Sequence, residues 1–571
     1  MGIRVNRLLS EVNIGITTLD SVLKALGYKE QDLTINTKIS DEIANIVRGL
    51  CSKDTDLLTL IEIAGEKKDY SNSKKLIDSI NTPHPLKYSE KQSFWISELA
   101  ILSPDGKVNI INVGSFKDAK SLPLYSVLIG TNGTGKSMLM KDIVDFFIDL
   151  RVCANGTDPK ISLANKGRLK GIRYHIDGLE CEVIRLEKSY LAKIDGYIRA
   201  LKDLRLPSIV ACHFGAFDKL PTQKVNGSAQ TKYDVPYYKY VGAHVNGSMI
   251  SSSAIAFRLL FALNEQMDKR QRQNICSILD FIGYEHRISL SYSVVMKSKK
   301  DGVVIEDIKK EVDDDNDYDT YSRQEKNEIV NKLYTFYKNK SSAPKTIYDY
   351  DIDFDSSSGG SLEELQFIYK LKKYRFINSA NVIFHKQGVD ITSEDLSSGE
   401  FAMLSTVLSI SAAANDPHTL VLLDEPELSL HPNWQMTLID NLDRALANQV
   451  CHLLIATHSH MLVSDLPMKR SAVTQIEKDK EGRVYGNAIA ECTYGWSAEE
   501  VLLKVFKTAT DRNKYLAEVV GALLKNIGDN TITTKEVRAQ MDFLESVSGN
   551  LSDIDPMKKI ISTIIEGFEG K

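Results

Sequence analysis

The chain has 571 residues, of which 43% are apolar. At about 150 residues per domain this length corresponds to roughly two to four domains, and the apolar share excludes disorder of the whole chain. Lysine and arginine number 71 and aspartate and glutamate 76, for a net charge of −5. That balance excludes a wholly basic nucleic-acid coat but leaves room for a local basic patch.

The seven cysteines are scattered and form no C-x-x-C pair, which argues against a disulfide framework and against a structural zinc site. The N-terminus has no apolar stretch of signal-peptide length, and the longest apolar run, from Phe401, is too short to span a bilayer. We therefore expect a cytoplasmic protein with no membrane partner.

Residues 1–85 have the pattern of a small helical module. Apolar residues recur near helical spacing from Leu8 to Leu26, and Thr17 with Asp20 can cap a second helix. About 25 residues of this stretch loosely resemble the N-terminal helical subdomain of bacterial translation initiation factor two. We interpret the module as a docking or capping bundle without chemistry of its own.

From Phe94 the pattern predicts strands. Residues 94–102 and 107–116 flank a turn at 103–106, and residues 122–130 form a short apolar run that ends in glycine, as a buried parallel strand does. Further strand-like runs lie at 207–217 and 288–296.

Two acidic stretches, at 313–319 and at 349–355, interrupt the middle of the chain. Aspartates alternate in the second, but a calcium loop that started at Asp349 would need glycine and glutamate where Phe354 and Gly360 stand. We predict that both stretches are solvated, mobile loops.

A phosphate-binding loop is predicted between the strand at 122–130 and the helix-like run after Ser137. The eight residues match G-x-x-x-x-G-K-[ST]; they are Gly130, Thr131, Asn132, Gly133, Thr134, Gly135, Lys136 and Ser137. Glycines let successive backbone N–H groups face the phosphates of a nucleotide. Lys136 then contacts the β- and γ-phosphates of ATP, and Ser137 is a ligand of Mg²⁺.

Three further motifs follow, and each alone also has a plain structural interpretation. Asp424 and Glu425 end an apolar strand, where acidic turns are common; there they can hold Mg²⁺ and activate water. Ser397, Ser398, Gly399 and Glu400 form a helix-capping box that can also bind an anion. His458 ends another apolar strand.

The order of the four motifs resembles that of ATP-binding cassette (ABC) ATPases. The resemblance covers the nucleotide-binding parts of residues 90–470 and implies that residues 397–400 are the signature, which contacts the γ-phosphate held by another subunit. It implies that Asp424 binds the metal, that Glu425 is the catalytic base and that His458 is the switch histidine. Residues 428–431 occupy the position of the loop that crosses the dimer interface. No glutamine marks a Q-loop, and His213 or Asp218 is the candidate replacement near the metal.

Residues 424–432 are similar to the soluble branch of the family that includes the OLD and RecF-like proteins. The long interval between Ser137 and Leu396 argues against a transporter subunit, and the absence of sustained heptads excludes long coiled-coil arms. The runs at 212–221, 240–252 and 493–502 make the chain most similar to Septu-type ATPases of anti-phage defence, which also occur with retrons. That resemblance implies a separate HNH-type nuclease, with a reverse transcriptase and nucleic acid as further partners.

The resulting prediction is an α/β protein: an ABC-type ATPase head with a large α+β insertion, a small N-terminal helical domain and a helical C-terminal tail. The predicted boundaries are 1–85, 86–160, 161–375, 376–470 and 471–571. The expected function is a Mg²⁺-dependent ATP hydrolase that dimerises, or forms a higher oligomer, around ATP and regulates a nuclease without being one. The alternative is an ATP-controlled DNA-binding clamp of repair or recombination.

Overall fold

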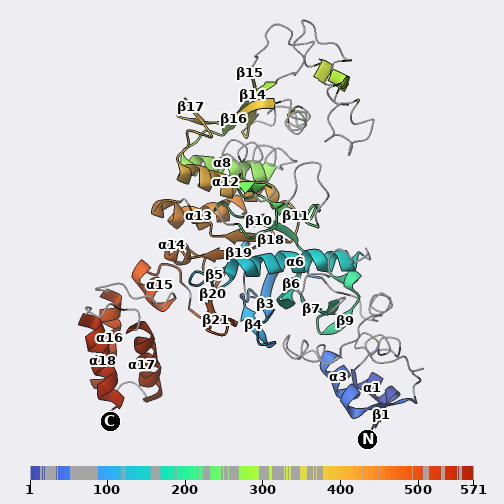
Figure 1. Ribbon diagram of the computed structural model, residues 1–571, viewed down its shortest axis with the longest axis vertical. Helices are drawn as coiled ribbons and strands as arrows, with labels where there is room; N and C mark the ends of the chain where they lie inside the picture. The colour runs from blue at the N-terminus through green and yellow to red at the C-terminus, as the bar shows by residue number, and fades with distance from the viewer. Residues whose placement is uncertain are drawn as a thin grey trace.

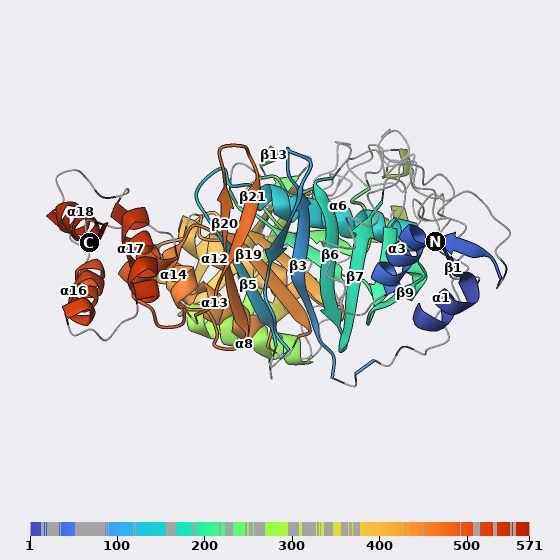
Figure 2. The ribbon, with the colours of Figure 1, turned by 90° about the horizontal axis from the view of Figure 1, so that it is seen from below.

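The structure is a computed structural model (Figure 1). It describes residues 2–12, 36–51, 91–155, 167–222, 232–249, 269–294, 347–355, 377–505, 514–528, 534–548 and 556–569, except for 118, 120–121, 187–189, 216–217, 246–247, 429, 448 and 492, together with a few isolated residues between these ranges. The N-terminal and C-terminal helices lie at opposite ends of a central body of sheets (Figure 2). In the described parts, no helix is both long and apolar enough to cross a membrane.

The central sheet has seven strands in the order β11-β10-β18-β19-β5-β20-β21. All neighbours are parallel except the last pair. The strands are β5 (Leu124–Ile129), β10 (Ser208–Cys212), β11 (Tyr238–Tyr240), β18 (Thr419–Asp424), β19 (Cys451–Thr457), β20 (Ser471–Lys478) and β21 (Val484–Ile489). The predicted buried parallel strands that precede the phosphate-binding loop and the two acids are thus confirmed.

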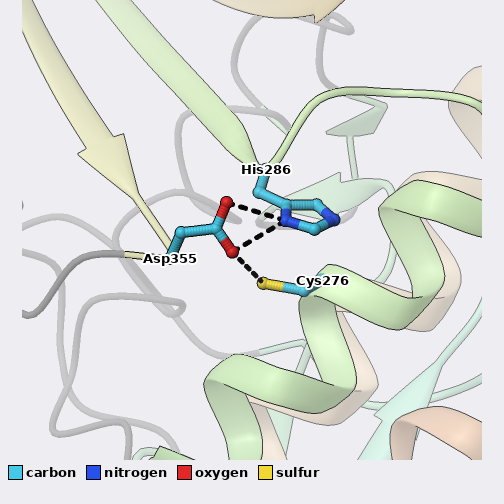
Figure 3. A group of neighbouring side chains, drawn as sticks. All are labelled: Cys276, His286 and Asp355. Atoms are coloured by element: carbon cyan, nitrogen blue, oxygen red, sulfur yellow. Dashed lines mark hydrogen bonds and ion pairs between the residues drawn. The ribbon is translucent and has the colours of Figure 1, made fainter.

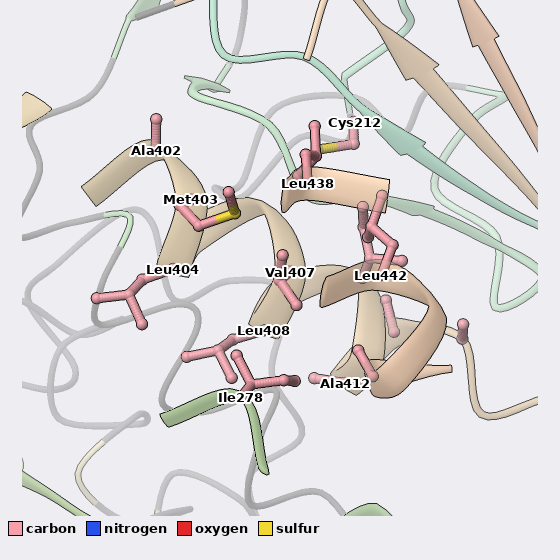
Figure 4. Close-up of a cluster of buried hydrophobic side chains, with 14 of the residues drawn as sticks. Cys212, Ile278, Ala402, Met403, Leu404, Val407, Leu408, Ala412, Leu438 and Leu442 are labelled. Carbon is pink, nitrogen blue, oxygen red and sulfur yellow. The ribbon is translucent and has the colours of Figure 1, made fainter. Parts of the chain in front are cut away.

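Both faces of this sheet are covered, which explains the unbroken apolar runs of its strands. In β18, Leu420 and Leu422 join one core together with helix α6 (Lys136–Ala154). Val421 and Leu423 join the opposite core with helices on the other face. Those helices are α8 (Lys269–Ile282), α12 (Ser398–Ala413) and α13 (Pro432–Ala445), whose side chains interdigitate in Figure 4.

A second, antiparallel sheet packs on the α6 side, in the order β4-β3-β6-β7-β8-β9. Its strands are β3 (Phe94–Leu102), β4 (Val108–Asn112), β6 (Leu169–Ile176), β7 (Leu179–Arg185), β8 (Tyr190–Ile194) and β9 (Tyr197–Arg199). The predicted hairpin of β3 and β4 is confirmed, and Gly106 in its turn has a φ of 83°, a conformation that favours glycine. The predicted boundaries of the insertion stay a prediction, although two strands within it pair directly with strands of the head: β6 pairs with β3, and β10 pairs with β18.

A third sheet, β15-β14-β16-β17, lies beyond α8 and α12 (Figure 1). Its strands are β14 (Arg287–Val294), β15 (Ile347–Asp353), β16 (Ile377–Lys386) and β17 (Val389–Thr392). The prediction of a solvated loop at 349–355 is wrong, because most of this stretch is strand β15. Tyr350, Ile352 and Phe354 alternate with the aspartates and are buried in the core below, so the period of two is that of a half-buried strand.

Smaller units lie at the two ends. The N-terminal unit contains β1 (Gly2–Arg4), α1 (Val5–Val12), β2 (Lys38–Ser40) and α3 (Asp41–Cys51), and it shares a core with residues of the second sheet such as Ile184, Leu191 and Ile198. The C-terminal helices α16 (Lys514–Gly528), α17 (Thr534–Ser548) and α18 (Pro556–Glu569) form another core, linked by α15 (Ala498–Lys504) to α14 (His460–Ser464). The predicted cap by Thr17 and Asp20 and the acidic stretch 313–319 lie outside the described residues.

A buried histidine joins the two main sheets. His452 in β19 is fully buried, its Nδ1 accepts a hydrogen bond from the backbone N–H of Ile96 at 3.2 Å, and its Nε2 lies 2.8 Å from Ser126 Oγ. An accepting Nδ1 leaves the proton on Nε2, so the ring is neutral and donates to Ser126. Burial lowers the pKa of His452 to about 3.

We expect this histidine to make the protein less stable in mild acid. The unfolded chain binds a proton at His452 below about pH 6.5, whereas the folded chain does not until about pH 3, so the free energy of unfolding falls as the pH drops through this window. At pH 5 the loss from this one group is about 2 kcal/mol. Denaturant unfolding at pH 7 and pH 5 measures it: the His452→Gln variant should lose less stability between the two values than the wild type, and equal losses would contradict the assignment.

Candidate active site

The loop between β5 and α6 has the conformation that its glycines were predicted to allow. Gly133 and Gly135 have φ values of 82° and 95°, in the left-handed region. A Cβ atom on Gly130 would lie 2.3 Å from the backbone oxygen of Ile476 in β20, so only glycine fits there. Gly135 is the N-cap of α6 and no side chain caps the helix. The first backbone N–H groups of α6 are therefore left for an anion.

Lys136 lies folded into this loop. Its Nζ donates hydrogen bonds to the backbone oxygens of Gly130 at 2.7 Å and Thr131 at 3.3 Å, and it lies 2.8 Å from His458 Nε2. Burial lowers the pKa of Lys136 to about 8, and nearby carboxylates, Glu425 foremost, oppose that shift. The pKa of His458 is also lowered, first by burial and then by Lys136, so its neutral ring accepts a hydrogen bond from the Lys136 ammonium.

Ser137 and Asp424 meet at the carboxyl end of the sheet. Ser137 Oγ donates to Asp424 Oδ1 at 3.1 Å, whereas Asp424 Oδ2 is buried without a hydrogen-bond partner among the described residues. Burial raises the pKa of Asp424, and the Ser137 hydroxyl opposes this shift. A buried carboxylate oxygen without a donor beside a hydroxyl is a donor set of the kind Mg²⁺ prefers, so the two side chains fit the ion.

Glu425 is held in an unusual backbone conformation. Its φ is 49°, in the left-handed region that non-glycine residues rarely adopt, and its N–H donates to the oxygen of Ala456 in β19 at 2.8 Å. Such a residue costs on the order of 1 kcal/mol or more and persists only where its surroundings impose it. The carboxylate is 30% exposed, and its Oε1 lies 3.7 Å from His458 Nε2. The strained turn thus keeps a reachable carboxylate beside the histidine.

Glu427 was not among the predicted site residues, and the sequence left open whether His213 or Asp218 lies near the metal. Glu427 accepts a hydrogen bond from the backbone N–H of His458 at 2.6 Å and ties the acidic turn to the end of β19. His213, at the end of β10, lies with its Nδ1 2.8 Å from the backbone oxygen of Asp424, while Asp218 accepts from the hydroxyl of Tyr240. The structure therefore brings His213 into contact with the acidic strand end. A histidine directly after an apolar strand was the signal for it.

The four residues predicted to form the signature lie at the start of α12. Ser397 is the N-cap, and the capping box that it forms with Glu400 is confirmed. The box also lowers the pKa of Glu400, against the effect of burial. Glu400 accepts a hydrogen bond from the hydroxyl of Tyr284, which precedes β14, at 3.3 Å, and it lies 3.6 Å from Lys386, the last residue of β16. Ser397 and Ser398 are exposed. None of the contacts described for these four residues involves the phosphate-binding loop of the same chain.

The comparisons with known proteins agree with this arrangement. Residues 293–465 match the family described as "AAA domain, putative AbiEii toxin, Type IV TA system". The Septu protein PtuA of Bacillus thuringiensis is 24% identical over 157 residues, which are 27% of this chain and 37% of that protein. The chain therefore aligns with little more than a third of the length of this curated relative.

Among solved structures, the SMC head domain from Thermotoga maritima is 11% identical, with a TM-score of 0.32 over 69% of this chain and 99% of that one. The SmcHead bound to the C-winged helix domain of ScpA has 11% identity and a TM-score of 0.30, over 69% and 98% of the two chains. The motifs, the sheet that carries them and the family match support an ABC-type ATPase head that resembles the Septu ATPases.

Proposed function

We propose that the chain is a Mg²⁺-dependent ATPase that closes as a homodimer around two ATP molecules and thereby controls a separate nuclease of the HNH type in anti-phage defence. The observation that carries the proposal is the convergence of Lys136, Ser137, Asp424, Glu425 and His458 at one edge of the sheet. The Septu likeness supports the defence role.

Each residue of the site has a task that its position suits. Lys136 exchanges its contacts with the loop oxygens and His458 for the phosphates of ATP. Ser137 and Asp424 hold Mg²⁺, which supplies charge neutralisation of the phosphates. Glu425 accepts a proton from the attacking water, and a neutral His458 orients the same water or the γ-phosphate.

The exposed signature explains why two subunits are needed. Ser397 and Ser398 face solvent, and the N-terminal N–H groups of α12 form an anion site that a second chain can supply with a γ-phosphate. Because the contacts between the signature and the γ-phosphate form only in the closed dimer, their free energy shifts the equilibrium between open and closed states towards the closed dimer when ATP binds. A retron reverse transcriptase with its nucleic acid is a further partner that the Septu-type resemblance implies.

The site of Ser398 allows a test of both dimer and partner. We expect Ser398→Arg to bind ATP as the wild type does but to stay monomeric with ATP, because the arginine blocks the approach of the second subunit. Light scattering measures the mass of the particle with and without ATP. The full chain is also tagged and purified from its host under both conditions. This purification shows whether a nuclease accompanies the chain and whether ATP changes the cleavage of DNA by that nuclease. In the variant, ATP should no longer change that cleavage.

The matched control is Val389→Arg, an exposed position on β17 in the same part of the molecule, 60% exposed. It should dimerise normally. A chain that purifies without a nuclease and binds DNA by itself with strong salt dependence would overturn the proposal in favour of the DNA clamp.

A further inference from the structure

Three side chains with metal-binding atoms converge far along the chain from the phosphate-binding loop (Figure 3). Cys276 lies in α8, His286 directly precedes β14, and Asp355 follows β15. His286 Nδ1 lies 2.8 and 2.9 Å from the two oxygens of Asp355, and Cys276 Sγ lies 3.7 Å from Asp355 Oδ1. Among the described residues this is the group of His, Cys and acidic side chains whose ligand atoms all lie within 4.8 Å of one another.

The backbone sets this geometry. Strands β14 and β15 pair with Arg287 opposite Asp353, and the N–H of Phe354 donates to the oxygen of His286 at 2.9 Å. These bonds hold His286 and Asp355 side by side where the two strands leave the sheet. Cys276 lies in α8, and a short turn connects the end of this helix to His286.

We propose that Cys276, His286 and Asp355 bind one transition-metal ion of the zinc class. Zinc bonds of about 2.0 to 2.3 Å in a tetrahedron place ligand atoms about 3.3 to 3.8 Å apart. The 3.7 Å between Cys276 Sγ and Asp355 Oδ1 lies in this range, whereas the 2.8 and 2.9 Å between His286 Nδ1 and the Asp355 oxygens are those of a hydrogen bond and must lengthen to admit the ion. The thiolate and the imidazole favour zinc and similar ions over Mg²⁺ and Ca²⁺, which prefer oxygen ligands. Asp355 is 67% exposed, so water has access to the fourth position.

A fourth side chain occupies the position of an outer-shell partner. Asp280 Oδ1 lies 2.9 Å from His286 Nε2, the ring nitrogen that faces away from Asp355. Asp280 follows Cys276 by one helical turn of α8, so both lie on the same face of the helix. At this distance Asp280 forms an ion pair with His286 Nε2 without the geometry of a hydrogen bond, so its side chain must rotate slightly to accept the ring N–H. A carboxylate that accepts the second ring N–H orients a metal-bound histidine and strengthens it as a ligand.

The ion would act as a clip between α8 and the third sheet. Tyr284, two residues before His286, donates to Glu400 of the signature, so a fixed corner at 276–286 also fixes one contact of that motif. The proposal uses no residue of the nucleotide site, so it can be tested independently of the ATPase assignment. Its alternative is a cluster held by hydrogen bonds alone, with Cys276 as a protonated donor.

The experiment uses Co²⁺ and Zn²⁺ as probes on the full chain, purified under reducing conditions and freed of metal, in the presence of excess Mg²⁺. We expect one equivalent of metal per chain and, with Co²⁺, the near-ultraviolet absorption of a cobalt–thiolate bond. Cys276→Ser should remove that absorption. Asp280→Asn, at a side chain that is 69% exposed, should fold normally and weaken binding about 10- to 100-fold.

The control is Cys153→Ser in α6, at a partly exposed cysteine outside the cluster, which should bind the metal as the wild type does. Thermal unfolding of each variant without metal separates a lost ligand from a damaged fold. The proposal is wrong if the chain binds no equivalent of metal, or if Cys276→Ser and Asp280→Asn bind it as tightly as the wild type. Either result would leave the hydrogen-bonded cluster as the correct description.

Discussion

Replacement of Lys136 by alanine is expected to abolish ATP binding at concentrations that saturate the wild type. Lys136 is the buried cation of the loop, and each charged hydrogen bond that it makes to a phosphate contributes about 1.5 to 3 kcal/mol. Loss of one or two such bonds raises the dissociation constant about 10- to 1,000-fold or more. Calorimetric titration with ATP and Mg²⁺ measures this, and the hydrolysis rate should fall to background.

The matched control is Lys141→Ala on the same helix, one turn further from the loop. It should bind ATP within a few-fold of the wild type, since the described contacts of the loop do not involve it. Thermal unfolding tests whether Lys136→Ala is folded, because the change also removes the cation beside three carboxylates. A folded Lys136→Ala variant that binds ATP with wild-type affinity would show that this loop is not the nucleotide site.

Replacement of Glu425 by glutamine is expected to separate binding from hydrolysis. Glutamine keeps the size and shape of the side chain but cannot take a proton from water, so the hydrolysis rate should fall about 10²- to 10⁴-fold while ATP still binds. The closed dimer should then persist, because the step that ends it is blocked. Steady-state ATPase assays measure the first effect and light scattering with ATP the second. Any partner nuclease should remain in the state that it adopts when the ATPase has bound ATP.

Glu481→Gln is the control, at an exposed carboxylate in the turn between β20 and β21. It should hydrolyse ATP at the wild-type rate and should not trap a dimer. If Glu425→Gln hydrolysed ATP as fast as the wild type, Glu425 would not be the base. His458, 3.7 Å away, would then be the next residue to replace.

Local patterns were sufficient for the parts of the site that lie close together in sequence. The glycines of the loop, the strand that ends in Asp424 and the capping box of Ser397 and Glu400 each depend on neighbours within a few residues. Their catalytic and ligand roles stay predictions that the variants above test. The stretch 349–355 shows the limit of composition: its acids suggested a loop, whereas the apolar residues between them have the period of a strand.

The sequence by itself determined the class of the head and the order of its motifs, because both reside in short runs whose backbone chemistry is local. Only the tertiary structure decided which distant residues meet. Sheet pairing places His213 against Asp424, and the corner of α8, β14 and β15 joins Cys276, His286 and Asp355 in a chain whose cysteine spacing argued against zinc. Strand order and register determine which of these distant residues come into contact, and the spacing of residues along a single sequence does not predict either of them.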